Sequence, residues 1–142
     1  MRIIGLDVGD KTIGVAMSDE LGITAIPLTV ISRTGSLKRE IGEIRRLVEE
    51  HGVGCIVVGM PFMLDGSKGI QAEKVEAFVE ELRRRLRVPI ATWDERFTTA
   101  EVERILIASD QSREKRKKVI DKMAAAVMLR SYMDSRGKTD EP

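Results

Sequence analysis

Three acidic residues of this 142-residue chain stand at positions from which they could act together on a substrate. Asp7 ends an apolar run typical of a buried strand, and Glu95 follows a later run of the same kind. Asp121 lies in a long helical stretch, close to three consecutive alanines. Magnesium and manganese prefer carboxylate oxygens, and such ions can activate water for attack on a phosphodiester. Asp7, Glu95 and Asp121 are therefore candidate catalytic residues and metal ligands.

Each acid also has a simpler structural explanation. Asp7 could merely stabilise a turn with Gly9. Glu95 could interact with the N-terminal dipole of a following helix, and Asp121 could form an ion pair with Lys117 one helical turn away. Taken singly, these explanations are the more economical ones. A metal site requires a fold that brings the three carboxylates to the same edge of a sheet, where ligands bind in open α/β proteins.

The choice of metal is narrowed by the composition. The chain has one cysteine, Cys55, and one histidine, His51. This is too few for a Cys/His zinc site or for cysteine–histidine catalysis. Cys55 lies in an apolar run and is expected to be an inert buried thiol, and His51 is expected at a solvated helix end. A bound ion must therefore be held by oxygens, which favours Mg²⁺ or Mn²⁺, with Ca²⁺ as a further oxygen-bound cation.

The pattern of apolar residues predicts three strands followed by alternating helices and strands. We expect a hairpin in which the second strand pairs antiparallel with the first, and an edge position for the third strand because it contains Pro27. This order predicts an α/β protein with a mixed five-stranded sheet and helices on both faces. The expected strands lie near residues 3–7, 12–18, 25–31, 55–59 and 88–93, and the expected helices near 41–48, 75–86, 98–107 and 112–134.

Positive charge is concentrated near Asp121, although the net charge of the whole chain is only +1. Residues 113–122 contain six basic residues and two acids. Such a patch beside carboxylates suits a phosphate backbone, and the few aromatic residues favour recognition of backbone and shape over base stacking. The candidate nucleic-acid-binding residues are Lys11, Arg96, Arg116, Lys117 and Lys118.

The location and assembly of the protein follow from simpler features. No apolar stretch approaches the roughly 20 residues needed to cross a bilayer, and the N-terminus lacks a signal-peptide pattern. We expect a cytoplasmic protein that makes no membrane contact and is a monomer or a weak dimer.

Several blocks of the sequence resemble the YqgF (RuvX) family. They occur in the order and spacing of that family, and the likeness extends from Met1 to about Asp134. The blocks are Gly5-Leu6-Asp7-Val8-Gly9 with Thr12-Ile13-Gly14-Val15-Ala16, Val58-Gly59-Met60-Pro61 with Gly66, Asp94-Glu95-Arg96-Phe97-Thr98-Thr99-Ala100, and Lys117-Lys118-Val119-Ile120-Asp121-Lys122-Met123-Ala124-Ala125.

The resemblance implies a ribonuclease H-like fold, in one domain over residues 1–135 with a frayed tail at 136–142. It also implies a metal-dependent nuclease that processes the 5′ end of the pre-16S ribosomal RNA, with Asp7, Glu95 and Asp121 as metal-binding acids. RuvC-type resolvases carry two further acids, at places that read Gly59-Met60-Pro61 and Ala124 here. The smaller ligand set counts against tight binding of two metals and against junction resolution.

Three functions remain as hypotheses. The preferred one is a nuclease acting on structured RNA. The second is a Holliday junction resolvase acting on four-way DNA, which would need a two-fold dimer. The third is a non-catalytic RNA-binding assembly factor that uses the basic helix. An ATPase of the actin/hexokinase kind would need two domains of this fold and a second phosphate-binding loop. A chain of 142 residues is too short for both.

Overall fold

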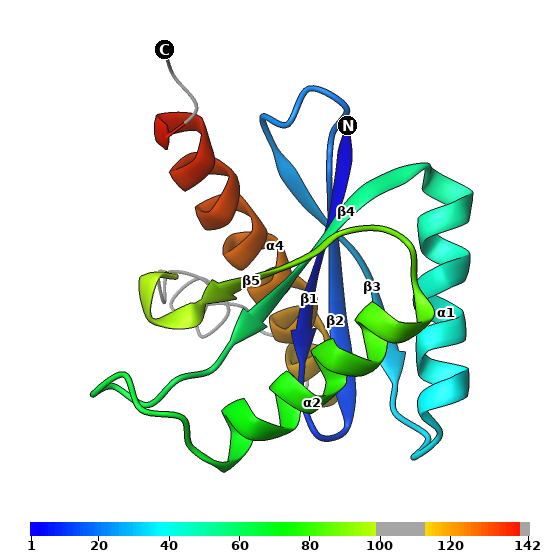
Figure 1. Cartoon of the computed structure of the whole chain (residues 1–142), viewed down its shortest axis with the longest axis vertical. Helices are drawn as coiled ribbons and strands as arrows, with labels where there is room; N and C mark the ends of the chain where they lie inside the picture. The colour runs from blue at the N-terminus through cyan, green and yellow to red at the C-terminus, as the bar shows by residue number, and fades with distance from the viewer. Residues whose placement is uncertain (99–112, 140–142) are drawn as a thin grey trace.

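The computed structural model describes residues 1–98 and 113–139, with side chains of the last helix described over 121–136. The described part forms one five-stranded sheet with helices on both faces (Figure 1). This confirms the expected α/β class. The elements are β1 (Arg2–Val8), β2 (Thr12–Ser18), β3 (Ala25–Ser32), α1 (Leu37–His51), β4 (Val53–Met60), α2 (Ile70–Arg85), β5 (Ile90–Asp94), the 3₁₀ helix η1 (Glu95–Phe97) and α4 (Arg113–Thr139).

The strand that ends near Asp7 lies at the centre of the sheet. The strand order is β3-β2-β1-β4-β5, with β2 antiparallel to β1 and with β4 and β5 parallel to it. The predicted hairpin and the edge position of the strand that contains Pro27 are both confirmed. Because β1, β4 and β5 run in the same direction, their carboxyl ends lie along one side of the sheet, the carboxyl edge.

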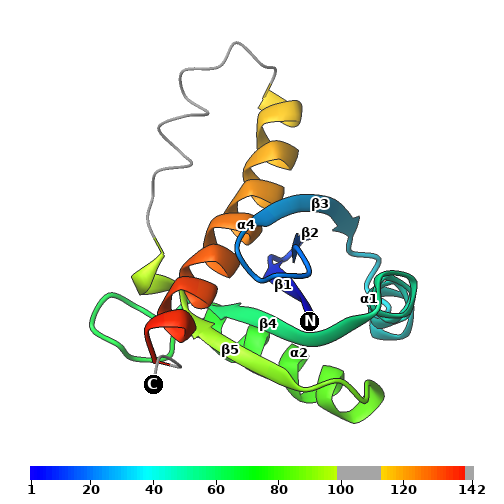
Figure 2. The same ribbon diagram turned by 90° about the horizontal axis from the view of Figure 1, so that it is seen from above.

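The alternation of side chains along β1 divides the core into two layers. Ile4, Leu6 and Val8 point toward α1 and α2, where they join the larger apolar cluster. The opposite face is covered by α4 (Figure 2). The Leu129 side chain of this helix lies close to Gly5. Asp7 lies two residues after Gly5 in the strand, so it is on the same face of the sheet and faces α4.

The structure confirms one predicted helix end and shifts another. The helix α1 ends at His51, as expected, because Gly52 adopts a left-handed conformation with φ of 62°. The helix α4 continues to Thr139, past the expected end at Asp134. The predicted helix at 98–107 lies outside the described residues except for Thr98, which follows η1. No helix in the described ranges is long and apolar enough to cross a membrane.

Candidate active site

Asp7 occupies a place in the sheet that is flanked by glycine on both sides. It pairs with Gly14 of β2. On the other side, Leu6 pairs with Val58, so Gly59 stands beside Asp7 in the parallel strand β4. Glycine in a strand interior often marks a close approach by another group. Here the missing side chains admit neighbouring groups on both sides of the partly buried Asp7 carboxylate.

Glu95 fills the space above Gly59. It is the first residue of η1, directly after β5, and the preceding Asp94 caps this short helix by accepting a hydrogen bond from the amide of Arg96 (3.0 Å). A Cβ atom at Gly59 would collide with the Glu95 carboxyl group. The turn after β5 therefore directs Glu95 back over β4 toward Asp7.

The carboxyl groups of Asp7 and Glu95 share a hydrogen bond, and burial dominates their ionisation. Burial, the negative charge of Asp7 and this hydrogen bond raise the pKa of Glu95 to about 8. The pKa of Asp7 is also raised, first by burial, while the hydrogen bond from Glu95 opposes this shift and the charge of Asp121 adds to it. At neutral pH the pair of carboxyl groups therefore holds one proton in this hydrogen bond. Burial and the like charge of the neighbouring group make it costly for both carboxyl groups to ionise, and a cation beside them would remove that cost.

Asp121 approaches the same site from α4. The helix crosses β2 so closely that a Cβ atom at Gly14 would collide with the backbone carbonyl of Asp121. The Asp121 side chain accepts a hydrogen bond from the hydroxyl of Thr12 at 2.6 Å. Its negative charge adds to the rise that burial causes in the pKa of Asp7.

The structure thus joins two of the predicted acids directly and leaves the third beside them. Within the described ranges, no group of three or more His, Cys, Asp or Glu side chains is arranged to hold a metal ion. The Asp7–Glu95 pair nevertheless fits a hard divalent cation, because such an ion would replace the proton that the two carboxyl groups share.

The predicted phosphate-binding residues have different surroundings. Arg96 is paired with Asp94, with 2.6 Å between Nη2 and Oδ2, and this guanidinium lowers the pKa of Asp94. The same guanidinium lies over the rings of Phe62 and Phe97. Lys11 is exposed in the turn between β1 and β2. Arg116, Lys117 and Lys118 lie in α4, but their side chains are outside the described set, as is the suggested ion pair of Lys117 with Asp121.

Other residues of this region were missed by sequence reasoning. Thr12 donates a hydrogen bond to the Asp121 carboxylate. Gly14 and Gly59 allow the close approach of Asp121 and Glu95, and glycine inside a strand was the sequence signal for these contacts. Cys55 is half-buried, and burial raises the pKa of its thiol, in line with an unreactive cysteine.

The fold is shared with RuvC-type resolvases. T. thermophilus RuvC in complex with a Holliday junction substrate matches with a TM-score of 0.61 and 15% identity, covering 100% of this chain and 99% of that chain. Fowlpox virus resolvase with Holliday junction DNA matches with a TM-score of 0.54 and 15% identity, covering 96% and 99%. At this identity the likeness shows the fold, which is ribonuclease H-like as predicted.

Sequence comparison then gives the family. The family model RuvX, described as Holliday junction resolvase, matches residues 1–135. A relative from Desulforamulus reducens, provisionally named pre-16S rRNA nuclease, is 53% identical over 138 residues, covering 97% of this chain and 100% of the relative. The chain belongs to the RuvX family, as the sequence blocks predicted.

Proposed function

We propose that this chain is a metal-dependent nuclease that processes the 5′ end of the pre-16S ribosomal RNA in the cytoplasm. The observation that carries the proposal is the Asp7–Glu95 carboxyl pair at the carboxyl edge of β1, β4 and β5. The name of the D. reducens relative supports the choice of an RNA substrate. Residues 1–135 form the catalytic domain in this proposal.

Asp7 and Glu95 would hold Mg²⁺ or Mn²⁺, and Asp121 would complete the ligand set. When bound, such a cation supplies activation of water and stabilisation of the leaving oxygen. Glu95 must lose its proton before both carboxylates can act as ligands, so binding becomes easier as the pH rises toward the Glu95 pKa of about 8. Lys11, Arg96, Arg116, Lys117 and Lys118 would contact phosphates of the structured nucleic acid.

Arg96 would bind phosphate from a prepared position. Its guanidinium is held by Asp94 and lies over the rings of Phe62 and Phe97, so these contacts orient it before substrate arrives. Arginine presents several donors in one plane, which leaves edge donors for a phosphate while Asp94 is engaged. Arg96 immediately follows Glu95, which would keep the phosphate close to the carboxyl pair.

A second candidate function is resolution of four-way DNA junctions. It is favoured by the description of the family model and by the fold shared with RuvC and the fowlpox resolvase. Symmetric cutting of a junction needs two active sites, and hence a two-fold dimer. The oligomeric state in solution therefore separates the two functions, because a strict monomer could not cut a junction symmetrically.

A cleavage assay tests the proposal. Wild type, Asp7→Asn and Asp10→Asn would be compared on a pre-16S rRNA fragment and on a four-way DNA junction, with Mg²⁺, Mn²⁺ or chelator. Asp10 is a matched control, since it is an exposed acid in the next turn that pairs with Lys74. We expect metal-dependent cutting of the RNA that Asp7→Asn abolishes and Asp10→Asn retains. Cutting by Asp7→Asn would refute the site, and symmetric cutting of the junction would establish the second candidate.

The same assay separates a nuclease from a binding factor. RNA binding by wild type without cleavage of either substrate, and with equal binding by Asp7→Asn, would refute the enzymatic proposal for bare RNA. Repeating the assay on precursor ribosomal particles would then show whether cleavage needs the assembling ribosome.

A further inference from the structure

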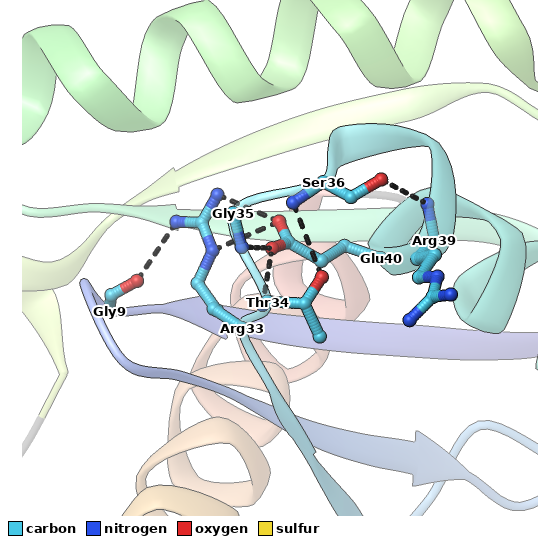
Figure 3. Close-up of polar contacts among 7 residues, drawn as sticks. All are labelled: Gly9, Arg33, Thr34, Gly35, Ser36, Arg39 and Glu40. Atoms are coloured by element: carbon cyan, nitrogen blue, oxygen red, sulfur yellow. Dashed lines mark hydrogen bonds and ion pairs between the residues drawn. The ribbon is translucent and has the colours of Figure 1, made fainter.

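A buried ion pair lies beside the turn that links β1 and β2 (Figure 3). Glu40, in the first turn of α1, is only 2% exposed, and Arg33 lies in the loop between β3 and α1. Neither residue belongs to the proposed acids or to the phosphate-binding set. Burial of a charged carboxylate costs free energy unless an opposite charge and hydrogen bonds satisfy its oxygens.

Glu40 is fully engaged by the loop that precedes it. Its Oε1 atom accepts hydrogen bonds from Nε and Nη2 of Arg33, at 3.1 and 3.0 Å. Its Oε2 atom accepts from the backbone amides of Thr34 and Gly35, at 3.0 and 3.2 Å. The guanidinium also lies over the Phe78 ring of α2, 5.1 Å from the centroid. These contacts leave the Arg33 side chain a single orientation.

The third guanidinium nitrogen of Arg33, Nη1, contacts the β1–β2 turn. Nη1 donates to the carbonyl of Gly9 at 3.0 Å, and the backbone amide of Arg33 donates to the carbonyl of Lys11 at 2.9 Å. Within the turn, the amide of Gly9 donates to the carbonyl of Thr12 at 2.8 Å. Arg33 therefore holds the turn at two points, one by side chain and one by backbone.

This turn joins the strand that carries Asp7 to the strand that begins with Thr12, the hydrogen-bond partner of Asp121. Gly9 lies two residues after Asp7, and Thr12, at its other end, donates to Asp121. We infer that Arg33, oriented by Glu40, is a positioning residue that fixes the β1–β2 turn and with it the spacing of Asp7 and Asp121. The inference rests on the proposed function, because it assigns the pair a role in metal binding and cleavage beyond stability.

Arg33→Lys is the informative variant. It keeps a positive charge beside the buried Glu40, so the protein should fold, but a single ammonium cannot bind both Glu40 and the Gly9 carbonyl in the same way. Arg46→Lys is the matched control, because Arg46 pairs with two glutamates on the exposed face of the same helix. Urea unfolding of both variants gives the folded fraction to which all other values are corrected.

Amide hydrogen exchange of the metal-free protein tests the contact independently of catalysis. We expect Arg33→Lys to speed exchange at the Gly9 amide by about tenfold or more, as expected when local opening becomes easier. Exchange in β4 and α2 should stay as in wild type, and Arg46→Lys should change none of these. Unchanged exchange at Gly9 in Arg33→Lys would overturn the inference.

Mn²⁺ affinity and the kinetic constants then test the positioning role. We expect Arg33→Lys to weaken Mn²⁺ binding and to lower kcat by about tenfold, with KM for RNA little changed, since misplaced ligands affect chemistry more than backbone binding. Wild-type kcat and Mn²⁺ affinity in Arg33→Lys would overturn the inference while leaving the proposed function intact. A wild type that neither cleaves nor binds Mn²⁺ would refute the proposed function, and the positioning role with it.

Discussion

Asp7 owes its surroundings to neighbours that lack side chains. Gly59 makes room for the Glu95 carboxyl group, and Gly14 makes room for the backbone of Asp121. The two glycines differ in what a methyl group would meet. At Gly59 it meets the end of a flexible side chain, and at Gly14 it meets rigid helix backbone. The first should therefore matter for chemistry and the second for folding.

Gly59→Ala should reduce activity far more than stability. The new Cβ would displace the Glu95 carboxyl group from Asp7, and misplacement of a catalytic group by an ångström can cost about 100-fold in rate. We expect kcat to fall by about that factor, with a melting temperature close to wild type. Gly42→Ala in α1, where a Cβ meets nothing within 4 Å, is the control and should remain fully active. An active Gly59→Ala protein would show that the contact of Glu95 with Asp7 is dispensable.

The raised pKa of Glu95 predicts how the metal-free protein responds to pH. The ordinary value is 4.5 and the folded value is about 8, so between these the folded state holds a proton that the unfolded state has released. Stability must then fall as the pH rises through this window, by up to about 1.4 kcal/mol per pH unit from this group. Urea unfolding in chelator from pH 5 to 8.5 would measure it. Glu95→Gln, which does not titrate, should remove this part of the slope, and an identical slope in the variant would contradict the assignment.

At the scale of elements, the site depends on how α4 lies across β2. Leu129 packs on Gly5, and the carbonyl of Asp121 lies against Gly14, so small residues set the distance between the helix and the sheet. Thr12 then fixes the helix near its Asp121 turn. The helix is therefore both the cover of one apolar layer and the carrier of the third acid.

Gly14→Ala should destabilise the protein by about 1–3 kcal/mol or more, because α4 as a whole must move to admit the methyl group. Chemical denaturation followed by circular dichroism would measure this. Gly42→Ala is again the control, and there a gain of roughly 0.5–1 kcal/mol is expected because glycine is unfavourable inside a helix. Equal stability of Gly14→Ala and wild type would mean that α4 does not press on β2 as the structure shows.

The sequence predicted elements better than it predicted contacts between them. Five strands, the hairpin, the edge strand and the end of α1 follow from local periodicity, from Pro27 and from Gly52, and the structure confirms them. The rotation of α4 about its axis has no local signal, so the hydrogen bond from Thr12 to Asp121 was not foreseen. The sequence carries no local signal for the pairing of Arg33 with Glu40, because only the packed loop brings the two side chains together.

At the scale of the molecule, one sheet edge collects the features that a phosphodiester-cleaving enzyme needs. The central strand provides Asp7, the last strand leads into Glu95 and Arg96, and the helix across the other face brings Asp121. The acids come from segments far apart in the chain, so the site exists only in the folded protein. Cation binding should therefore stabilise the fold as a whole.

Mn²⁺ titration at pH 8 tests whether Asp7 and Glu95 together bind a divalent cation. Electron paramagnetic resonance and the shift in melting temperature would follow binding in wild type, Asp7→Asn, Glu95→Gln and the control Asp10→Asn. We expect saturable binding that raises the melting temperature of wild type and Asp10→Asn, and its loss in both Asp7→Asn and Glu95→Gln. Equal binding in all four proteins would show that this carboxyl pair is not the cation site.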